Sequence, residues 1–181
     1  MGTKQDIRKN CMCKRELLSP EERINKSNVI AKKVIEHPLF IKANTIYCYI
    51  DCKSEVMTHQ IIETAWLMNK KVAVPRVLNK QREMEFYYIN TFEDLEPGYF
   101  GLLEPLQSMQ KADEEDALVI IPCVGFDLAL NRLGYGKGFY DKYLATHKLL
   151  DKIMIAYTTQ CVTCIPAESM DIKPDIVITE G

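Results

Sequence analysis

Residues 117–143 read "ALVIIPCVGFDLALNRLGYGKGFYDKY", and this stretch decides the fold. Its first six residues form a continuous apolar run of strand length, as is typical of strands buried in a parallel sheet. Glycines follow at 134, 136 and 138, and the residues from about Phe139 to His147 are predicted to form a helix. A strand, a loop and a helix in this order indicate an α/β fold, with the loop at the carboxyl end of a strand, where ligands bind in such sheets.

The rest of the chain alternates between helix and strand patterns in the same way. Ser19 and Glu22 match a capping box, which predicts a helix that begins at Pro20 and runs to about His37, where Pro38 should end it. Further helices are expected over 4–17 and 58–70, the latter capped by Thr58, and strands over 44–50, 71–75, 84–89, 117–122, 152–157 and 175–179. Pro75 should end its strand, and 93–105 should be irregular. The sequence therefore predicts an α/β protein with a mostly parallel central sheet flanked by helices.

Length and composition limit the possible classes of protein. The 181 residues suit one domain spanning 1–181, with 47% hydrophobic and 27% charged residues, as in ordinary globular proteins. A formal net charge of -2 provides no basic field for nucleic acid. No apolar run approaches the roughly 20 residues of a membrane helix, and the N-terminal residues lack the apolar core of a signal peptide. We expect a cytoplasmic protein that binds small molecules, and a monomer, because nothing suggests a large hydrophobic interface.

Seven cysteines without a secretion signal are most simply read as reduced, scattered thiols. Cys161 and Cys164 form a C-x-x-C pair, which leaves a redox or zinc site as an alternative. The histidines His37, His59 and His147 show no ligand spacing with the cysteines.

The glycine loop has the composition of a phosphate site. Without Cβ atoms, its backbone N–H groups can approach an anion closely, and the following helix directs its positive end to the same place. Arg132 and Lys137 add full positive charges. The spacing is neither G-x-x-x-x-G-K-[ST] nor G-x-G-x-x-G, so a glycine-rich turn at a helix start remains the alternative.

Five further charged positions are candidates, each with an ordinary structural alternative. Asp141 in the first turn of the helix, with Asp175 at the last strand, could hold Mg²⁺ beside phosphates. Lys4 and Arg8 share a helix face and could clamp phosphate if the N-terminus lies near the loop. Glu55 could accept two hydrogen bonds from the N–H edge of a heterocycle.

The stretch "NRLGYGKGFYDKYL" closely resembles the signature of the 5-formyltetrahydrofolate cyclo-ligase (methenyltetrahydrofolate synthetase) family, R-x-G-x-G-x-G-[YF]-Y-D. The resemblance extends, in the right order, over nearly the whole chain: "KQDIR", "SEVMTHQII", "KVAVPRV", "YFGLLEP" and "LVIIPCVGFD" also match family segments. It implies a single-domain, Rossmann-like layered sandwich. It also implies an enzyme that uses ATP and Mg²⁺ to convert 5-formyltetrahydrofolate to 5,10-methenyltetrahydrofolate, releasing ADP and phosphate. In that chemistry the formyl oxygen is phosphorylated and N10 of the folate closes the ring.

The resemblance also implies roles for individual residues. Those expected to bind ATP are Lys4, Arg8, Arg132, Gly134, Gly136, Lys137, Gly138, Phe139 and Tyr140. Those expected to bind the folate are Ile50, Glu55, Tyr99, Tyr135, Gly136, Lys137, Gly138 and Phe139. Arg132, Lys137 and Tyr140 are the expected catalytic residues, and Asp141 and Asp175 the expected Mg²⁺ ligands.

Three positions depart from the common family pattern without removing a charge that the chemistry needs. Tyr99 stands where some members have Trp, Tyr135 occupies a variable slot, and Asn131 stands where a small residue is common. Two other functions remain as alternatives: a sugar-phosphate isomerase-like enzyme on a related fold, and a non-catalytic nucleotide- or folate-binding module.

Overall fold

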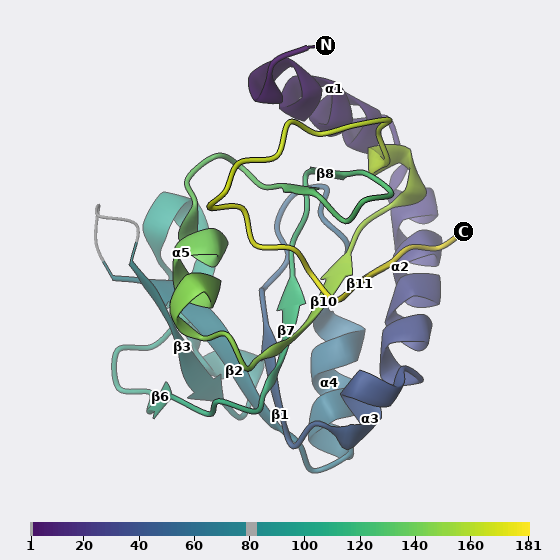
Figure 1. Cartoon of the computed structure of the whole chain (residues 1–181). Coiled ribbons are helices and arrows are strands. Elements are labelled where there is room, and N and C mark those ends of the chain that lie inside the picture. The colour runs from purple at the N-terminus through teal and green to yellow at the C-terminus, as the bar shows by residue number, and fades with distance from the viewer. Residues whose placement is uncertain (1, 79–82) are drawn as a thin grey trace.

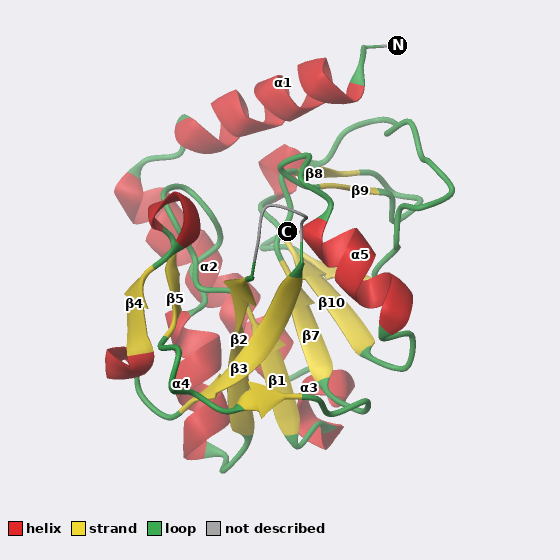
Figure 2. Cartoon of the chain, turned by 90° about the vertical axis from the view of Figure 1, so that its left-hand side faces the viewer, coloured by secondary structure: helices red, strands yellow, loops and turns green. Residues whose placement is uncertain are grey.

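The centre of the molecule is a seven-stranded sheet with the order β11-β10-β7-β1-β2-β3-β6 (Figure 2). The computed structural model describes residues 2–78 and 83–181. The strands are Thr45–Cys48 (β1), Lys71–Val77 (β2), Met84–Ile89 (β3), Lys111–Ala112 (β6), Leu118–Ile121 (β7), Asp151–Ile155 (β10) and Ile176–Ile178 (β11). The pairs β1–β2, β1–β7, β7–β10 and β10–β11 are parallel, and β3 joins β2 and β6 antiparallel. The expected mostly parallel α/β sheet is confirmed.

Helices cover both faces of this sheet (Figure 1). Pro20–Ile35 (α2), Pro38–Lys42 (α3) and His59–Leu67 (α4) lie on one face, and Phe139–Thr146 (α5) lies on the other. Ile46 and Cys48 of β1 belong to the core cluster beneath α2 and α4, whereas Tyr47 between them belongs to the cluster beneath α5. Successive side chains of a strand point to opposite faces, so a continuous apolar run fills both cores at once.

The N-terminal helix, Lys4–Glu16 (α1), crosses the edge of the sheet at which the parallel strands end (Figure 2). The Thr3 side chain accepts a hydrogen bond from the Asp6 backbone N–H, and the Asp6 carboxylate bonds the Thr3 N–H in return. The same reciprocal pair, Ser19 with Glu22, begins α2 as predicted. Such boxes satisfy N–H groups that have no partner inside the helix, which fixes where each helix begins.

Three details of the prediction are wrong and one, at Pro38, is incomplete. Thr58 precedes α4, but its hydroxyl bonds the Tyr49 carbonyl and the Asp51 carboxylate and does not cap the helix. Pro75 does not end β2, because β1 pairs only with 71–73 and no neighbour in this sheet needs an N–H on that side. Pro38 ends α2 but also starts α3.

The fourth detail is the segment 93–105, which contains a small hairpin of Leu95–Pro97 (β4) and Leu103–Pro105 (β5). Strands of two or three residues carry too little periodicity to be predicted, and the same holds for β6 and for the pair Gly125–Phe126 (β8) and Arg132–Leu133 (β9). In the described part of the chain, no helix has the length and apolar character needed to span a membrane.

Candidate functional site

The glycine loop lies at the carboxyl edge of the sheet, between β9 and α5. It follows β7 through the β8–β9 hairpin and leads directly into the first turn of α5. Gly136 and Gly138 have φ angles of 87° and 71°, the left-handed region that glycine adopts without strain. Gly138 is the N-cap of α5 and has no side chain to cap it. The N–H groups of that turn are therefore directed toward the loop, as the phosphate hypothesis requires.

Arg132 and Tyr140 bring polar atoms beneath the loop. Arg132 Nη2 donates to Asp141 Oδ1 over 2.9 Å, and the guanidinium carbon lies 5.8 Å from the centre of the Tyr140 ring. Arg132 Nε and the Tyr140 hydroxyl are buried, and neither has a hydrogen-bond partner among the described residues. Burial raises the pKa of Tyr140 well above its usual value, so this hydroxyl keeps its proton at neutral pH.

Arg8 of α1 holds the loop from the other side. Its Nε donates to the Gly134 carbonyl over 2.7 Å. A Cβ added at Gly136 would lie 3.2 Å from the Arg8 guanidinium carbon, so the side chain lies directly against that glycine. The condition set for a phosphate clamp, that the N-terminal helix lies near the loop, is met by Arg8.

Lys4 lies one turn earlier on α1 and is already paired. Its Nζ is 2.8 Å from Asp171 Oδ2 and 2.9 Å from Glu168 Oε1. Burial alone would lower the pKa of Lys4, but the hydrogen bonds and charges of the two acids outweigh it and leave the pKa raised. Burial would raise the pKa of Asp171, and the bonds from Lys4 and from the Glu168 N–H lower it instead.

The structure brings Asp171, and not Asp175, to the loop. The N–H of Ile172, the residue after Asp171, donates to Asp141 Oδ1 over 3.2 Å. Asp175 precedes β11 at the opposite edge of the sheet, where its carboxylate accepts the Lys152 N–H over 2.7 Å and lies 3.3 Å from Lys152 Nζ. Asp141 and Asp175 are therefore not brought together. The glycine loop lies where the parallel strands end, whereas Asp175 lies where β11 begins, at the other end of the strands.

Glu55 is buried beneath the tip of the loop. Its Oε1 accepts the hydroxyl of Tyr135 over 2.7 Å, and its Oε2 accepts the Cys52 N–H over 3.0 Å. The Tyr157 hydroxyl donates to the Glu55 carbonyl over 3.1 Å, which fixes its backbone. Arg15 of α1 donates to the same Tyr135 hydroxyl over 2.8 Å and to Ser54 Oγ over 3.0 Å.

The other expected site residues surround these groups. Lys137 is exposed on the loop, and Phe139 begins α5 and packs against the core beneath it. Ile50 follows β1 and packs against the core under α2 and α4. Tyr99 lies in the short helical turn Tyr99–Gly101 between β4 and β5.

Arg15 and Asp171 are the functional candidates that the sequence reasoning missed. A signal for Arg15 was present: Lys4, Arg8, Cys11 and Arg15 follow helical spacing along one face, and Cys11 and Arg15 are the buried residues of α1. Asp171 gave no comparable signal, because it lies in a segment without regular structure that only the tertiary fold brings to Asp141.

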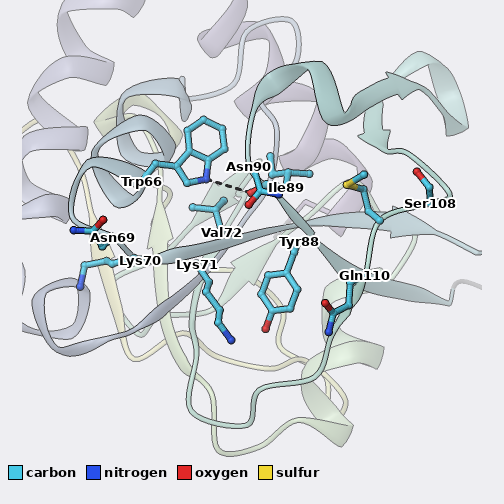
Figure 3. Close-up of a pocket in the computed structure, with 11 residues that line it drawn as sticks. Trp66, Asn69, Lys70, Lys71, Val72, Tyr88, Ile89, Asn90, Ser108 and Gln110 are labelled. Carbon is cyan, nitrogen blue, oxygen red and sulfur yellow. Dashed lines mark hydrogen bonds between the residues drawn. The ribbon is translucent and has the colours of Figure 1, made fainter.

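A cavity of about 580 Å³ lies away from the loop, at the amino end of β2 (Figure 3). The Lys71 and Tyr88 side chains lie beside each other there, with Lys71 Nζ 5.3 Å from the ring centre. Lys71 Nζ pairs with Glu114 Oε1 over 3.1 Å, and Lys70 Nζ bonds the carbonyl oxygens of Ile41 and Ala43. Its lysines are already paired and it includes none of the expected site residues, so the site lies at the loop.

The cysteine pair Cys161 and Cys164 does not lie at the start of a helix. All seven cysteines are free thiols, and Cys161 and Cys164 follow a short helical turn and do not begin a helix. The alternative of a C-x-x-C active site needs such a helix start to lower a thiol pKa.

Comparison with known proteins finds relatives that match nearly the whole chain. The model of the 5-formyltetrahydrofolate cyclo-ligase family matches residues 1–180. The mouse 5-formyltetrahydrofolate cyclo-ligase is 28% identical over 99% of this chain and 94% of its own. Two solved 5,10-methenyltetrahydrofolate synthetases share the fold. The one from Aquifex aeolicus is 31% identical with a TM-score of 0.83 over 98% of this chain and 89% of that one. The one from Mycoplasma pneumoniae is 27% identical with a TM-score of 0.78 over 98% and 99%. The glycine loop thus stands within a match that runs the length of the chain, which belongs to the 5-formyltetrahydrofolate cyclo-ligase family of ligases.

Proposed function

We propose that this enzyme uses ATP and Mg²⁺ to convert 5-formyltetrahydrofolate to 5,10-methenyltetrahydrofolate, with release of ADP and phosphate. Family membership supports the folate reaction and ATP as the co-substrate. The single observation that carries the assignment of the site is the glycine loop at the start of α5, with Arg8 and Arg132 held against it.

The ATP phosphates are placed in this proposal against Gly134–Gly138 and the first turn of α5. Arg132 Nε and the Tyr140 hydroxyl are buried donors without partners among the described residues. Leaving such donors unsatisfied costs roughly 1–3 kcal/mol each, so a bound acceptor is the simplest reason for keeping them. Phosphate oxygens would satisfy both, and Arg8 and Lys137 would neutralise further charge.

Asp141 and Asp171 are the acids that fit Mg²⁺. Of the hydrogen bonds made by the described residues, the two given to the Asp141 carboxylate both end on Oδ1, and the two given to Asp171 both end on Oδ2. Each carboxylate therefore keeps one oxygen for a cation. Among the described residues, no group of three or more His, Cys, Asp or Glu could hold a metal. This agrees with Mg²⁺, which takes one or two carboxylates and completes its shell with phosphate oxygens and water. When bound, the ion would neutralise phosphate charge.

The reaction requires the protein mainly to position the two substrates and to stabilise the charge on the phosphoryl group. The formyl oxygen attacks the γ-phosphorus of ATP and ADP leaves. N10 of the folate then attacks the formyl carbon, the new C–N bond closes the ring, N10 loses its proton, and phosphate departs with the former formyl oxygen. Arg132 and Lys137 stabilise the charge on the transferring phosphoryl group, and the neutral Tyr140 hydroxyl donates a hydrogen bond to it. Glu55 accepts hydrogen bonds from the N–H edge of the folate heterocycle. Apolar surface for the folate is provided by Ile50, Tyr99 and Phe139.

The first test is the growth of methenyltetrahydrofolate absorbance with purified protein, 5-formyltetrahydrofolate, ATP and MgCl₂. We expect growth only when all three small molecules are present, and excess EDTA should abolish it. Growth that continues without ATP would contradict the proposed reaction.

Replacing the groups beneath the loop tests the assignment of the site. Arg132→Gln and Asp141→Asn should each reduce kcat/KM by roughly 10²–10³-fold, because the first removes a positive charge that stabilises the transferring phosphoryl group and the second removes a carboxylate proposed to hold Mg²⁺. Asp151→Asn is the matched control: it breaks an ion pair of similar length, with Lys42 at 2.8 Å, at the other edge of the sheet. Wild-type turnover in either site variant, with its fold intact by circular dichroism, would refute the assignment.

A further inference from the structure

Three side chains from distant parts of the chain, those of Arg15, Tyr135 and Glu55, form a continuous line of hydrogen bonds. Arg15 Nη2 of α1 donates to the hydroxyl of Tyr135 at the loop tip over 2.8 Å. That hydroxyl donates to Glu55 Oε1 over 2.7 Å. Glu55 precedes α4, so the line ties the N-terminal helix and the glycine loop to the acid expected to read the folate.

This line leaves Glu55 covered. Glu55 is 8% exposed, and both of its carboxylate oxygens already accept a hydrogen bond. A heterocycle that bonds this carboxylate through its N–H edge must therefore displace something first. The bond to Oε2 comes from the Cys52 backbone N–H, which belongs to the same tight turn as Glu55.

Tyr135 is the group that can leave. Its side chain is 44% exposed, and it stands beside Gly136, whose φ is 87°. Arg15 is 2% exposed and is held by Ser54 as well as by Tyr135. The covering residue is thus on a glycine-rich loop, and the residue that holds it is fixed in a helix.

We propose that Tyr135 is a gate over Glu55 and that Arg15 is the positioning residue that keeps the gate closed. The Tyr135 hydroxyl takes the acceptor that the folate N–H edge needs, and the loop tip swings off Glu55 when 5-formyltetrahydrofolate binds. This inference rests on the proposed function and adds a step that governs folate binding alone.

Arg15 acts through Tyr135 in two ways. Its hydrogen bond to the hydroxyl oxygen makes the O–H a stronger donor to Glu55. Its guanidinium carbon also lies 5.8 Å from the Tyr135 ring centre, a cation–π distance. Both contacts belong to the closed position of the loop tip, so both oppose folate entry.

The test is the dissociation constant of 5-formyltetrahydrofolate, measured without ATP by calorimetry. Tyr135→Phe removes the hydroxyl and should tighten folate binding roughly tenfold, since a hydrogen bond to a charged group no longer has to be broken. The dissociation constant of ATP should not change. Tyr87→Phe is the matched control, because it removes another Tyr–Glu hydrogen bond, Tyr87 to Glu85 over 3.2 Å on β3, and should leave folate affinity as it is.

Arg15→Met completes a double-mutant cycle with Tyr135→Phe. Arg15→Met should tighten folate binding in the wild-type background and have a smaller effect beside Tyr135→Phe, where only the contact with the ring remains; Arg15→Lys serves if the Met variant does not fold. Folate binding that is unchanged or weaker in Tyr135→Phe overturns the gate, and additive effects of the two changes overturn the role of Arg15. If the wild-type protein itself bound no folate, the proposed function would fail first and the gate with it.

Discussion

At the scale of single residues, Asp127 shows how the turn between β8 and β9 is held in one shape. It is 2% exposed and accepts hydrogen bonds from the N–H groups of Ala129, Asn131 and Ile165 and from the Asn131 amide. It thereby closes the β8–β9 turn and joins it to the segment after Cys164. The hairpin that presents Arg132 to the site depends on this one carboxylate.

Asp127→Ala should lower the free energy of unfolding by about 2–4 kcal/mol, because it leaves the buried Ile165 N–H and the part-buried N–H groups of Ala129 and Asn131 without this acceptor. Urea unfolding at pH 7 measures this, and an unchanged midpoint would contradict the assigned role.

The same residue predicts a pH dependence of stability. Burial would raise the pKa of Asp127, but the bonds from Asn131, Ile165 and Ala129 lower it below its usual value. A folded pKa below the unfolded one means that the stabilisation is present above the unfolded pKa of about 3.9 and is lost as the pH falls through the folded value. Asp127→Asn should therefore show a smaller loss of unfolding free energy than wild type between pH 5 and the folded pKa; equal losses would contradict this.

Single residues also show how far the sequence could be interpreted alone. Three glycines, an arginine and Tyr-Asp in one loop have a composition that phosphate binding explains, so Arg132, Gly136 and Gly138 could be predicted. Arg15 could not be assigned a role, because a basic residue on a helix is usually solvated. Only the docked position of α1 shows that this one is buried against Tyr135.

At the scale of elements, α1 places basic side chains against the glycine loop and the segments beside it. It begins with a capping box, and Lys4, Arg8 and Arg15 project from one face onto Asp171, Gly134 and Tyr135. Its buried Cys11 lies against Gly125 of β8, where an added Cβ would be 2.9 Å from the sulfur.

Arg8→Gln should raise the KM for ATP roughly tenfold or more, because the charge and the bond to the Gly134 carbonyl are both lost. Lys9→Gln removes an exposed charge from the next position of the same helix and should leave the KM for ATP within twofold. Equal effects of the two substitutions on steady-state kinetics would mean that only the general field of α1 matters.

Elements with strong periodicity or caps were predicted well, and the others were not. The aromatic residues of 84–89 and the capping box at Ser19 are local signals. The β4–β5 hairpin is positioned by distant contacts instead, such as Glu104 accepting the Val77 N–H and Arg76 bonding Glu96 and the Pro105 carbonyl. No local pattern contains such pairings.

At the scale of the whole molecule, α2 contacts the residues that follow β11 at the end of the chain. Lys26 of α2 pairs with Glu180 over 2.7 Å, and Lys33 bonds the Thr179 carbonyl over 2.9 Å. We propose that residues 1–181 unfold as one domain, because these contacts join the N-terminal helices to the last strand of the sheet.

Thermal unfolding should therefore show one transition, and substrates should shift it upward. At a free ligand concentration of 100 times its dissociation constant, stability rises by about 2.7 kcal/mol. ATP with Mg²⁺ should raise the Tm more than ATP with EDTA, and 5-formyltetrahydrofolate should raise it independently. Two separate transitions in scanning calorimetry would contradict the single unit, and equal shifts with and without Mg²⁺ would contradict the assigned cation.

The hydrogen bond between Arg8 and the Gly134 carbonyl joins residues 126 positions apart, and this sets an order of events during synthesis. Chains grow at about 5–20 residues per second, so α1 leaves the ribosome on the order of 10 s before the loop that it holds. During that interval its cations have no loop to contact. The proposed site is therefore completed late in synthesis, and a stalled chain that ends before the loop lacks both this site and the strands β10 and β11 of the central sheet.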